Sequence, residues 1–130
     1  MPFSISYNAD LAICEIVVTG VYNDPLAEQI RSAAQEIILK HNCIRLIIDC
    51  RAAQLQTSTL SLLASPDEIK EILSAMEIPS FRLKRAFVVS RDIDDYSFIE
   101  TVSVNRGLQV RIFQDMKEAV SWLDPEENNP

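Results

Sequence analysis

The stretch IRLIID, residues 44–49, decides how this chain folds. It is short, apolar and rich in isoleucine, a composition typical of a central strand in a parallel sheet. Parallel neighbours must be joined by a crossover connection, which is usually a helix. The residues on either side of this stretch are therefore expected to alternate between strands and helices.

A hairpin is predicted at the start of the chain. Residues 3–7 alternate large apolar residues with serines, which is the pattern of a half-buried strand. Residues 8–10, Asn-Ala-Asp, supply turn chemistry, and residues 11–19 form a second strand. The tight spacing of the two strands makes them an antiparallel hairpin.

A helix is predicted between the hairpin and the central strand. Asp24 can accept hydrogen bonds from the first free amides, and Pro25 fits the first helical position. Asn42 suits the left-handed residue that ends a helix. Apolar residues recur at helical spacing between these ends: Leu26, Ile30, Ala33, Ala34 and Ile37.

The rest of the chain continues the alternation of helices and strands. Capping residues, prolines and glycine mark the boundaries. The predicted elements are a short helical run at 57–64, a helix from the Ser65–Glu68 capping box to Pro79, a strand at 85–90, a helix at 92–106 before Gly107, a strand at 109–113 and a final helix capped by Asp115.

The predicted order is β-β-α-β-α-β-α-β-α, which is an α/β fold with a mostly parallel five-stranded sheet. It fills one domain, residues 1–124, and residues 125–130 form a polar tail expected to be disordered. One sheet face is predicted to carry Ala12, Cys14, Ile16, Val18, Ile44, Leu46, Ile48, Ala86, Val88, Val110 and Ile112. The other face carries Arg45, Arg85 and Arg111 among apolar residues, so the helices are expected to cover the first face only.

Composition excludes several classes of function. The chain has 130 residues, 48% of them hydrophobic, and a net charge of −7 that disfavours binding to nucleic acid and to anionic lipid surfaces. The apolar runs are far shorter than a membrane span, and the first residues do not resemble a secretion signal, so a cytoplasmic protein without membrane insertion is expected. Cys14, Cys43 and Cys50 are best interpreted as reduced, mostly buried thiols. No metal site and no cofactor are predicted.

Two segments resemble a known family. LIIDCR at residues 46–51 and FIETVSVNRGLQVRIFQDMKEAVSWL at residues 98–123 are similar to the SpoIIAA-like fold of anti-sigma-factor antagonist (STAS) domains, and to small bacterial STAS/SEC14-like proteins. The resemblance implies a non-enzymatic regulatory or protein-interaction module. It also implies that a serine at the start of the helix after the third strand can be a phosphorylation switch.

The hydroxyl residues nearest to that switch position are Thr57, Ser58 and Thr59. The antagonist pattern is Asp-x-Ser-x-x-x-Gly, whereas residues 49–55 read DCRAAQL, without the serine and the glycine. A phosphate at Ser58 would gain from free amides at a helix start. The alternative is that Thr57 or Ser58 only caps the helix.

Cys50 is the candidate for a reactive thiol. It lies at the carboxyl end of the central strand, where α/β proteins place their sites, and the neighbouring Arg51 could favour a thiolate. The alternative is a packed thiol, because no activating base is near in sequence. Two other groups have simpler interpretations: His41 lies at a helix end, and the acidic residues from Asp92 to Asp95 suit a helix start.

The arginine-bearing sheet face is the candidate partner-binding surface. Its members are Arg45, Arg85, Phe87, Arg111 and Phe113, and arginine among aromatics is enriched at protein interfaces. A two-fold homodimer is the simplest use of such a face, and a solvated face is the alternative. Arg91 and Tyr96 are further candidate contacts for a protein partner at the strand-end loops.

A second function follows from the SEC14 side of the resemblance. It allows a small apolar ligand or lipid to bind in a pocket between the sheet and the helices. A chain of this length would have to open its core to hold one, and an empty cavity there would be destabilising.

Overall fold

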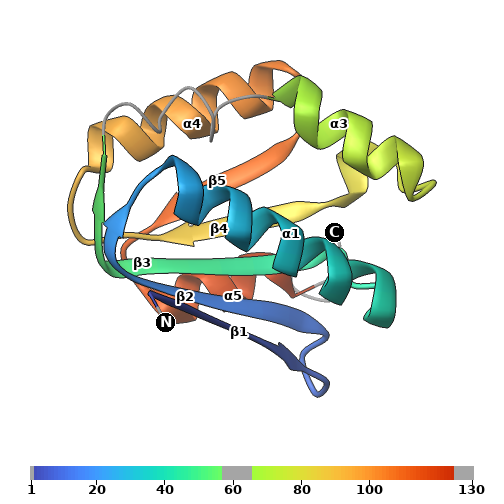
Figure 1. The fold of residues 1–130 in the computed structure, drawn as a ribbon, viewed down its shortest axis with the longest axis horizontal. Coiled ribbons are helices and arrows are strands. Elements are labelled where there is room, and N and C mark those ends of the chain that lie inside the picture. Colours follow the sequence, from blue (N-terminus) through green and yellow to red (C-terminus); the bar gives the residue numbers. More distant parts are fainter. Residues whose placement is uncertain (1, 57–65, 125–130) are drawn as a thin grey trace.

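The computed structural model describes residues 2–56 and 66–124. The predicted helical run at 57–64, the candidate phosphorylation residues Thr57, Ser58 and Thr59, and the predicted tail at 125–130 lie outside these ranges. The elements are β1 (Phe3–Asn8), β2 (Ile13–Tyr22), α1 (Asp24–His41), β3 (Arg45–Leu55), α3 (Pro66–Ala75), a 3-10 turn η2 (Ser80–Arg82), β4 (Lys84–Val88), α4 (Ile93–Asn105), β5 (Gln109–Phe113) and α5 (Met116–Leu123) (Figure 1).

Within the described residues the strands form one five-stranded sheet, ordered β1-β2-β3-β4-β5. β1 and β2 pair antiparallel, and the other neighbours pair parallel. The predicted hairpin and the predicted α/β fold are therefore confirmed. Because the strands follow one another in spatial order, β1 and β5 form the two edges of the sheet.

The central strand is longer than its sequence pattern predicts. β3 continues from Asp49 to Leu55, and its second half pairs with the end of β2 beyond an irregularity in register between Val17 and Thr19. Residues 51–54, Arg-Ala-Ala-Gln, have little intrinsic preference for strands, so their pattern gave no sign of the extension. The pairing with β2 holds them in the sheet.

The face assignment of β4 was wrong by one residue. Ile47 pairs with Ala86 and Ile48 with Phe87, so Ala86 lies on the face of Ile47 and Phe87 on the face of Ile48. The prediction placed Ala86 and Val88 on the face of Ile48. A shift of one residue moves every side chain of a strand to the opposite face, and β4 is apolar on both faces, so its composition did not fix the choice.

Helices cover both faces of the sheet, which corrects the expectation that they cover only one. α1, α3 and α4 pack against the face that carries Ile48 and Phe87. α5 packs against the opposite face, where it contacts β3, β4 and β5 (Figure 1). A second, smaller core lies under α5, and its members are Ile13, Ile47, Ala86, Val88, Phe113, Ala119 and Leu123. On that face the side chains of Ser4, Ser6 and Val17, from β1 and β2, remain exposed.

The ends of α1 combine a confirmed cap with a corrected one. Asn42 has the left-handed conformation predicted for it (φ 55°), and its N–H donates to the Ile38 carbonyl. The first turn is capped by Asn23, whose side chain accepts from the Leu26 N–H at 3.0 Å. Asp24, the predicted cap, is instead the first residue of the helix. Asp115 caps α5 as predicted, since its carboxylate accepts from the Lys117 N–H at 2.9 Å.

Candidate functional site

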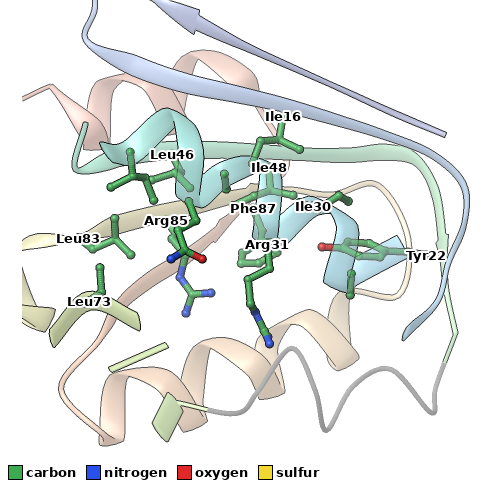
Figure 2. Close-up of a pocket in the computed structure, with 14 residues that line it drawn as sticks. Ile16, Tyr22, Ile30, Arg31, Leu46, Ile48, Leu73, Leu83, Arg85 and Phe87 are labelled. Carbon is green, nitrogen blue, oxygen red and sulfur yellow. The ribbon is translucent and has the colours of Figure 1, made fainter. Parts of the chain in front are cut away.

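A cavity of about 90 Å³ lies between α1 and the sheet (Figure 2). Strands β2, β3 and β4 form its floor, α1 forms one wall, and Leu73 of α3 lies opposite. The apolar side chains that line it are Ile16, Ala27, Ile30, Ala34, Ile38, Leu46, Ile48, Leu73, Leu83 and Phe87. This cavity lies where the sequence predicted a pocket between sheet and helices.

The polar residues of the cavity wall are Tyr22, Arg31, Gln35 and Arg85. In Figure 2 the guanidinium groups of Arg85, from β4, and Arg31, from α1, extend toward the same side of the cavity, and the Tyr22 hydroxyl points into the cavity. Among the lining residues that the structure describes, none is Asp or Glu. The wall therefore combines two positive charges and a hydroxyl with an apolar floor.

Arg85 carries its positive charge in the partly buried wall of the cavity. Burial lowers the pKa of its guanidinium to about 10, and the charge of Arg31 acts in the same direction. The group nevertheless stays protonated at neutral pH. Arg85 makes no hydrogen bond or ion pair with the side chains and backbone that the structure describes. A partly buried cation without an anion is unfavourable in free energy, so this site favours a negatively charged ligand.

Tyr22 and Arg31 extend the polar wall. Burial raises the pKa of the Tyr22 hydroxyl, although the charges of Arg85 and Arg31 act in the opposite direction, so the hydroxyl remains a neutral donor. Arg31 forms an ion pair with Glu28, with Nη1 and Oε1 3.4 Å apart, one turn earlier on α1. Glu28 lies at the outer surface, so the pair leaves the inner wall without a carboxylate.

Sequence reasoning did not find this group of residues. Arg31 and Gln35 are four residues apart, which places them on one side of a helix next to the apolar stripe of α1. Arg85 was assigned to the opposite face because of the register error in β4. The signal for this site was the positive charge of Arg85 among the apolar residues of β4. Using that signal required knowing which face of the sheet Arg85 lies on.

The predicted partner-binding surface is divided by the sheet. Arg85 and Phe87 lie on the cavity side, whereas Arg45, Arg111 and Phe113 lie on the side of α5. The Arg111 guanidinium lies 5.5 Å from the ring centre of Phe113, which is itself packed against Trp122. Arg45 donates from Nη1 to the Ala12 carbonyl at 3.4 Å. The single open face proposed for a homodimer is therefore not present.

The two predicted loop contacts also differ from each other. Arg91 is exposed, as a contact residue requires. Tyr96 has only 1% of its surface exposed, and its ring packs 5.8 Å from the ring of Phe87. Tyr96 is therefore a core residue on the buried side of α4, and it cannot contact a partner in this conformation.

Cys50 is a packed thiol in this structure. It is 1% exposed, and burial raises its pKa to about 12, so the thiol is protonated at neutral pH. Arg51 is not available to favour a thiolate, since its Nε and Nη2 each donate to the Asp49 carboxylate at 2.9 Å. Cys14 and Cys43 are buried and free as well. This environment does not suit a nucleophile.

The remaining chemical candidates have structural roles. The Asp92 carboxylate accepts a hydrogen bond from the Leu55 N–H at 3.2 Å, and the His41 ring stacks on Tyr7 at 3.9 Å. Within the described ranges no group of three or more His, Cys, Asp or Glu is placed to hold a metal ion. Over those same residues, no helix has the length and apolar character that a membrane span needs.

Comparisons with known proteins identify the fold. No protein-family model and no curated protein matches the sequence. The similar solved structures include an uncharacterised protein of the DUF3478 family with a SpoIIAA-like fold from Shewanella loihica PV-4, and an anti-sigma factor antagonist from Mycobacterium paratuberculosis. The first is 17% identical, with a TM-score of 0.55 over 93% of this chain and 91% of that chain. The second is 13% identical, with a TM-score of 0.54 over 93% of each chain. The chain therefore has the SpoIIAA-like fold, as its sequence resemblance predicted.

Proposed function

We propose that this domain is a non-enzymatic binding module, and that the cavity between α1 and the sheet holds a small ligand with an apolar part. The observation that supports the proposal is the cavity itself, whose lining is apolar except for the wall formed by Tyr22, Arg31, Gln35 and Arg85. Cavities lined in this way bind apolar molecules and are poor sites for water. A cavity left empty lowers the stability of the fold, so a ligand that fills it would raise that stability.

The size of the cavity limits what it can hold. At about 90 Å³ it is smaller than the sites that bury a drug-sized molecule, which are about 300–1,000 Å³. It suits a short alkyl chain or one small ring, with the rest of the ligand at the mouth. A whole membrane lipid would require α1 and the sheet to separate.

A substitution that fills the cavity tests this function. Ala34 of α1 lines the cavity, and Ala34→Leu would place additional methyl groups in it. Ala33→Leu is the matched control, since Ala33 is the preceding residue of the same helix and is not in the lining. We expect 1-hexanol to raise the melting temperature of the natural protein and of Ala33→Leu, but not that of Ala34→Leu. If 1-hexanol, hexanoate and hexyl phosphate all fail to bind the natural protein in calorimetry, the proposal is wrong.

A second candidate function is a protein-interaction module, which was the first expectation from the sequence. It is favoured by apolar side chains on the outer surface of α4, where Phe98 is 50% and Val104 is 54% exposed. The test is the sedimentation of the natural protein against the double variant Phe98→Ser, Val104→Ser over a range of concentrations. Self-association that the variant loses would support this candidate. A monomer at all concentrations would restrict it to a different protein as partner.

A further inference from the structure

We propose that the ligand of this cavity is an amphipathic anion, whose carboxylate or phosphate head is bound by Arg85, Arg31 and Tyr22 while its short apolar part lies against the sheet. This inference rests on the proposed function and adds the chemical class of the ligand. The apolar part of the cavity would equally suit a neutral molecule, and its polar wall is the feature that favours an anion.

The polar wall of the cavity carries positive charge, whereas the chain as a whole has a net negative charge. The protein carries 19 acidic and 12 basic residues, yet the described lining contains two arginines and no acidic residue. Arg85 projects from β4 into the partly buried wall of this cavity, where a cation is expected beside an anion. Since the side chains described in the structure provide none for Arg85, a bound anion is the group that would complete the site.

The donors have the chemistry that an anionic head requires. A guanidinium presents parallel N–H groups that bind both oxygens of a carboxylate or phosphate. The Tyr22 hydroxyl is a neutral donor that points into the cavity (Figure 2). Because Arg85 has no ion-pair partner among the described residues, a neutral or cationic head would leave its charge without a counter-ion.

The apolar part of the ligand has a defined place. Ile48 and Phe87 neighbour each other on β3 and β4, next to the base of Arg85. A head group at the guanidiniums would direct a short chain onto these side chains and toward Ala34 of α1. The ligand would thus have its charge at the mouth and its carbon chain inside.

Four probes that share one chain length test the head group. Hexanoate, hexyl phosphate, 1-hexanol and hexylammonium would each be titrated into the natural protein by calorimetry. We expect hexanoate or hexyl phosphate to bind at least about tenfold more tightly than 1-hexanol, since hydrogen bonds to charged groups are the strong ones. Hexylammonium should bind most weakly. The ranking of the two anions distinguishes a carboxylic acid from a phosphate ester as the natural class.

Variants of Arg85 test whether this residue causes the tighter binding of the anionic probes. Arg85→Met should reduce the affinity for the preferred anion about tenfold or more and change that for 1-hexanol much less, so the ratio of the two affinities measures the head-group contact. Arg85→Lys should retain part of the affinity, because it keeps the charge but loses the paired donors. Arg111→Met, on the opposite sheet face, should behave as the natural protein.

The outcomes separate this inference from the function on which it rests. If 1-hexanol binds as tightly as both anions, or if Arg85→Met binds the anions as the natural protein does, the head-group site is refuted while the apolar cavity remains. If no probe binds, the binding function itself is refuted.

Discussion

The backbone N–H of Leu55 donates to the side chain of Asp92 at 3.2 Å, which ties the end of β3 to the start of α4. Asp92 also has the left-handed backbone conformation (φ 56°), which few residues other than glycine, asparagine and aspartate adopt at low cost. One residue thus joins two segments that are 37 positions apart in the sequence. The connection holds the far end of the long central strand.

We expect Asp92→Ala to lower the free energy of unfolding by about 1–3 kcal/mol, because it removes the acceptor and strains the backbone. Asp92→Asn should cost less, since asparagine keeps an acceptor oxygen and tolerates the left-handed region. Urea denaturation measures both. Asp94→Ala, in the exposed first turn of α4, is the control, and equal losses in Asp92→Ala and Asp94→Ala would contradict the role of the tie.

Arg85→Met should make the ligand-free protein more stable. Burial lowers the pKa of Arg85 and so disfavours its charged form in the folded protein, and removing the charge is expected to stabilise the native state at neutral pH. Methionine keeps most of the aliphatic stem. We expect a gain of about 1 kcal/mol or more, which raises the melting temperature by about 3 °C or more. An unchanged or lower melting temperature, with Arg111→Met as reference, would contradict a destabilising buried charge.

The thiols should be unreactive in the folded protein. Burial raises the pKa of Cys50 and of Cys14 to about 12, so iodoacetamide at mildly alkaline pH should modify neither within minutes, while both react in urea. Mass spectrometry counts the labels. Ser6→Cys, on the exposed side of β1, should gain one rapid label; rapid labelling of Cys50 in the natural protein would restore it as a reactive thiol.

The raised pKa values of Cys14 and Cys50 predict that the protein loses stability at alkaline pH. Their pKa is higher in the folded protein than the ordinary value of 9.0, so the folded state binds protons more tightly than the unfolded state between pH 9 and about 12. The stabilisation is complete below pH 9 and is lost as the pH rises through that window. Cys50→Ala should reduce the slope of unfolding free energy against pH there. An equal slope in the variant would contradict this contribution.

Leu123→Ala should destabilise the fold by about 2–5 kcal/mol, the usual cost of truncating a core leucine. Leu123 of α5 is 0% exposed in the core on the far side of the sheet. Leu39→Ala, at a site 59% exposed on α1, is the control and should change stability little. A small effect of Leu123→Ala in urea denaturation would mean that α5 does not cover this face.

The sequence predicted correctly those elements that depend on residues close together in the chain, such as short strands and helix caps. β5 has the predicted bounds, and the caps at Asn42 and Asp115 lie where a left-handed residue and a free acceptor were expected. The second half of β3 was missed, because Ala52 and Ala53 form a strand only through pairing with β2. Such pairing is a property of the folded sheet and leaves little trace in composition.

The candidate site was harder to predict than the fold. A pocket between sheet and helices was one of the expected functions, but Arg85 was placed on the wrong face, and Tyr22 and Arg31 were not selected. The strand β4 reads Lys-Arg-Ala-Phe-Val. Both of its faces carry apolar residues, so its sequence does not show which face points toward α1. Only the pairing of Ile48 with Phe87 shows that Arg85 points toward α1.

The sheet divides the interior into two cores, and this division determines what the tryptophan fluorescence of the protein can report. The only tryptophan of the chain, Trp122, belongs to the core under α5, where its ring lies 5.8 Å from Phe113 and 5.1 Å from the Lys84 ammonium. Its emission reports the docking of α5, and the whole thickness of the sheet separates it from the cavity. A titration that leaves this fluorescence unchanged therefore carries no information about occupancy, and a spectral change on adding a ligand would signal motion transmitted through the strands.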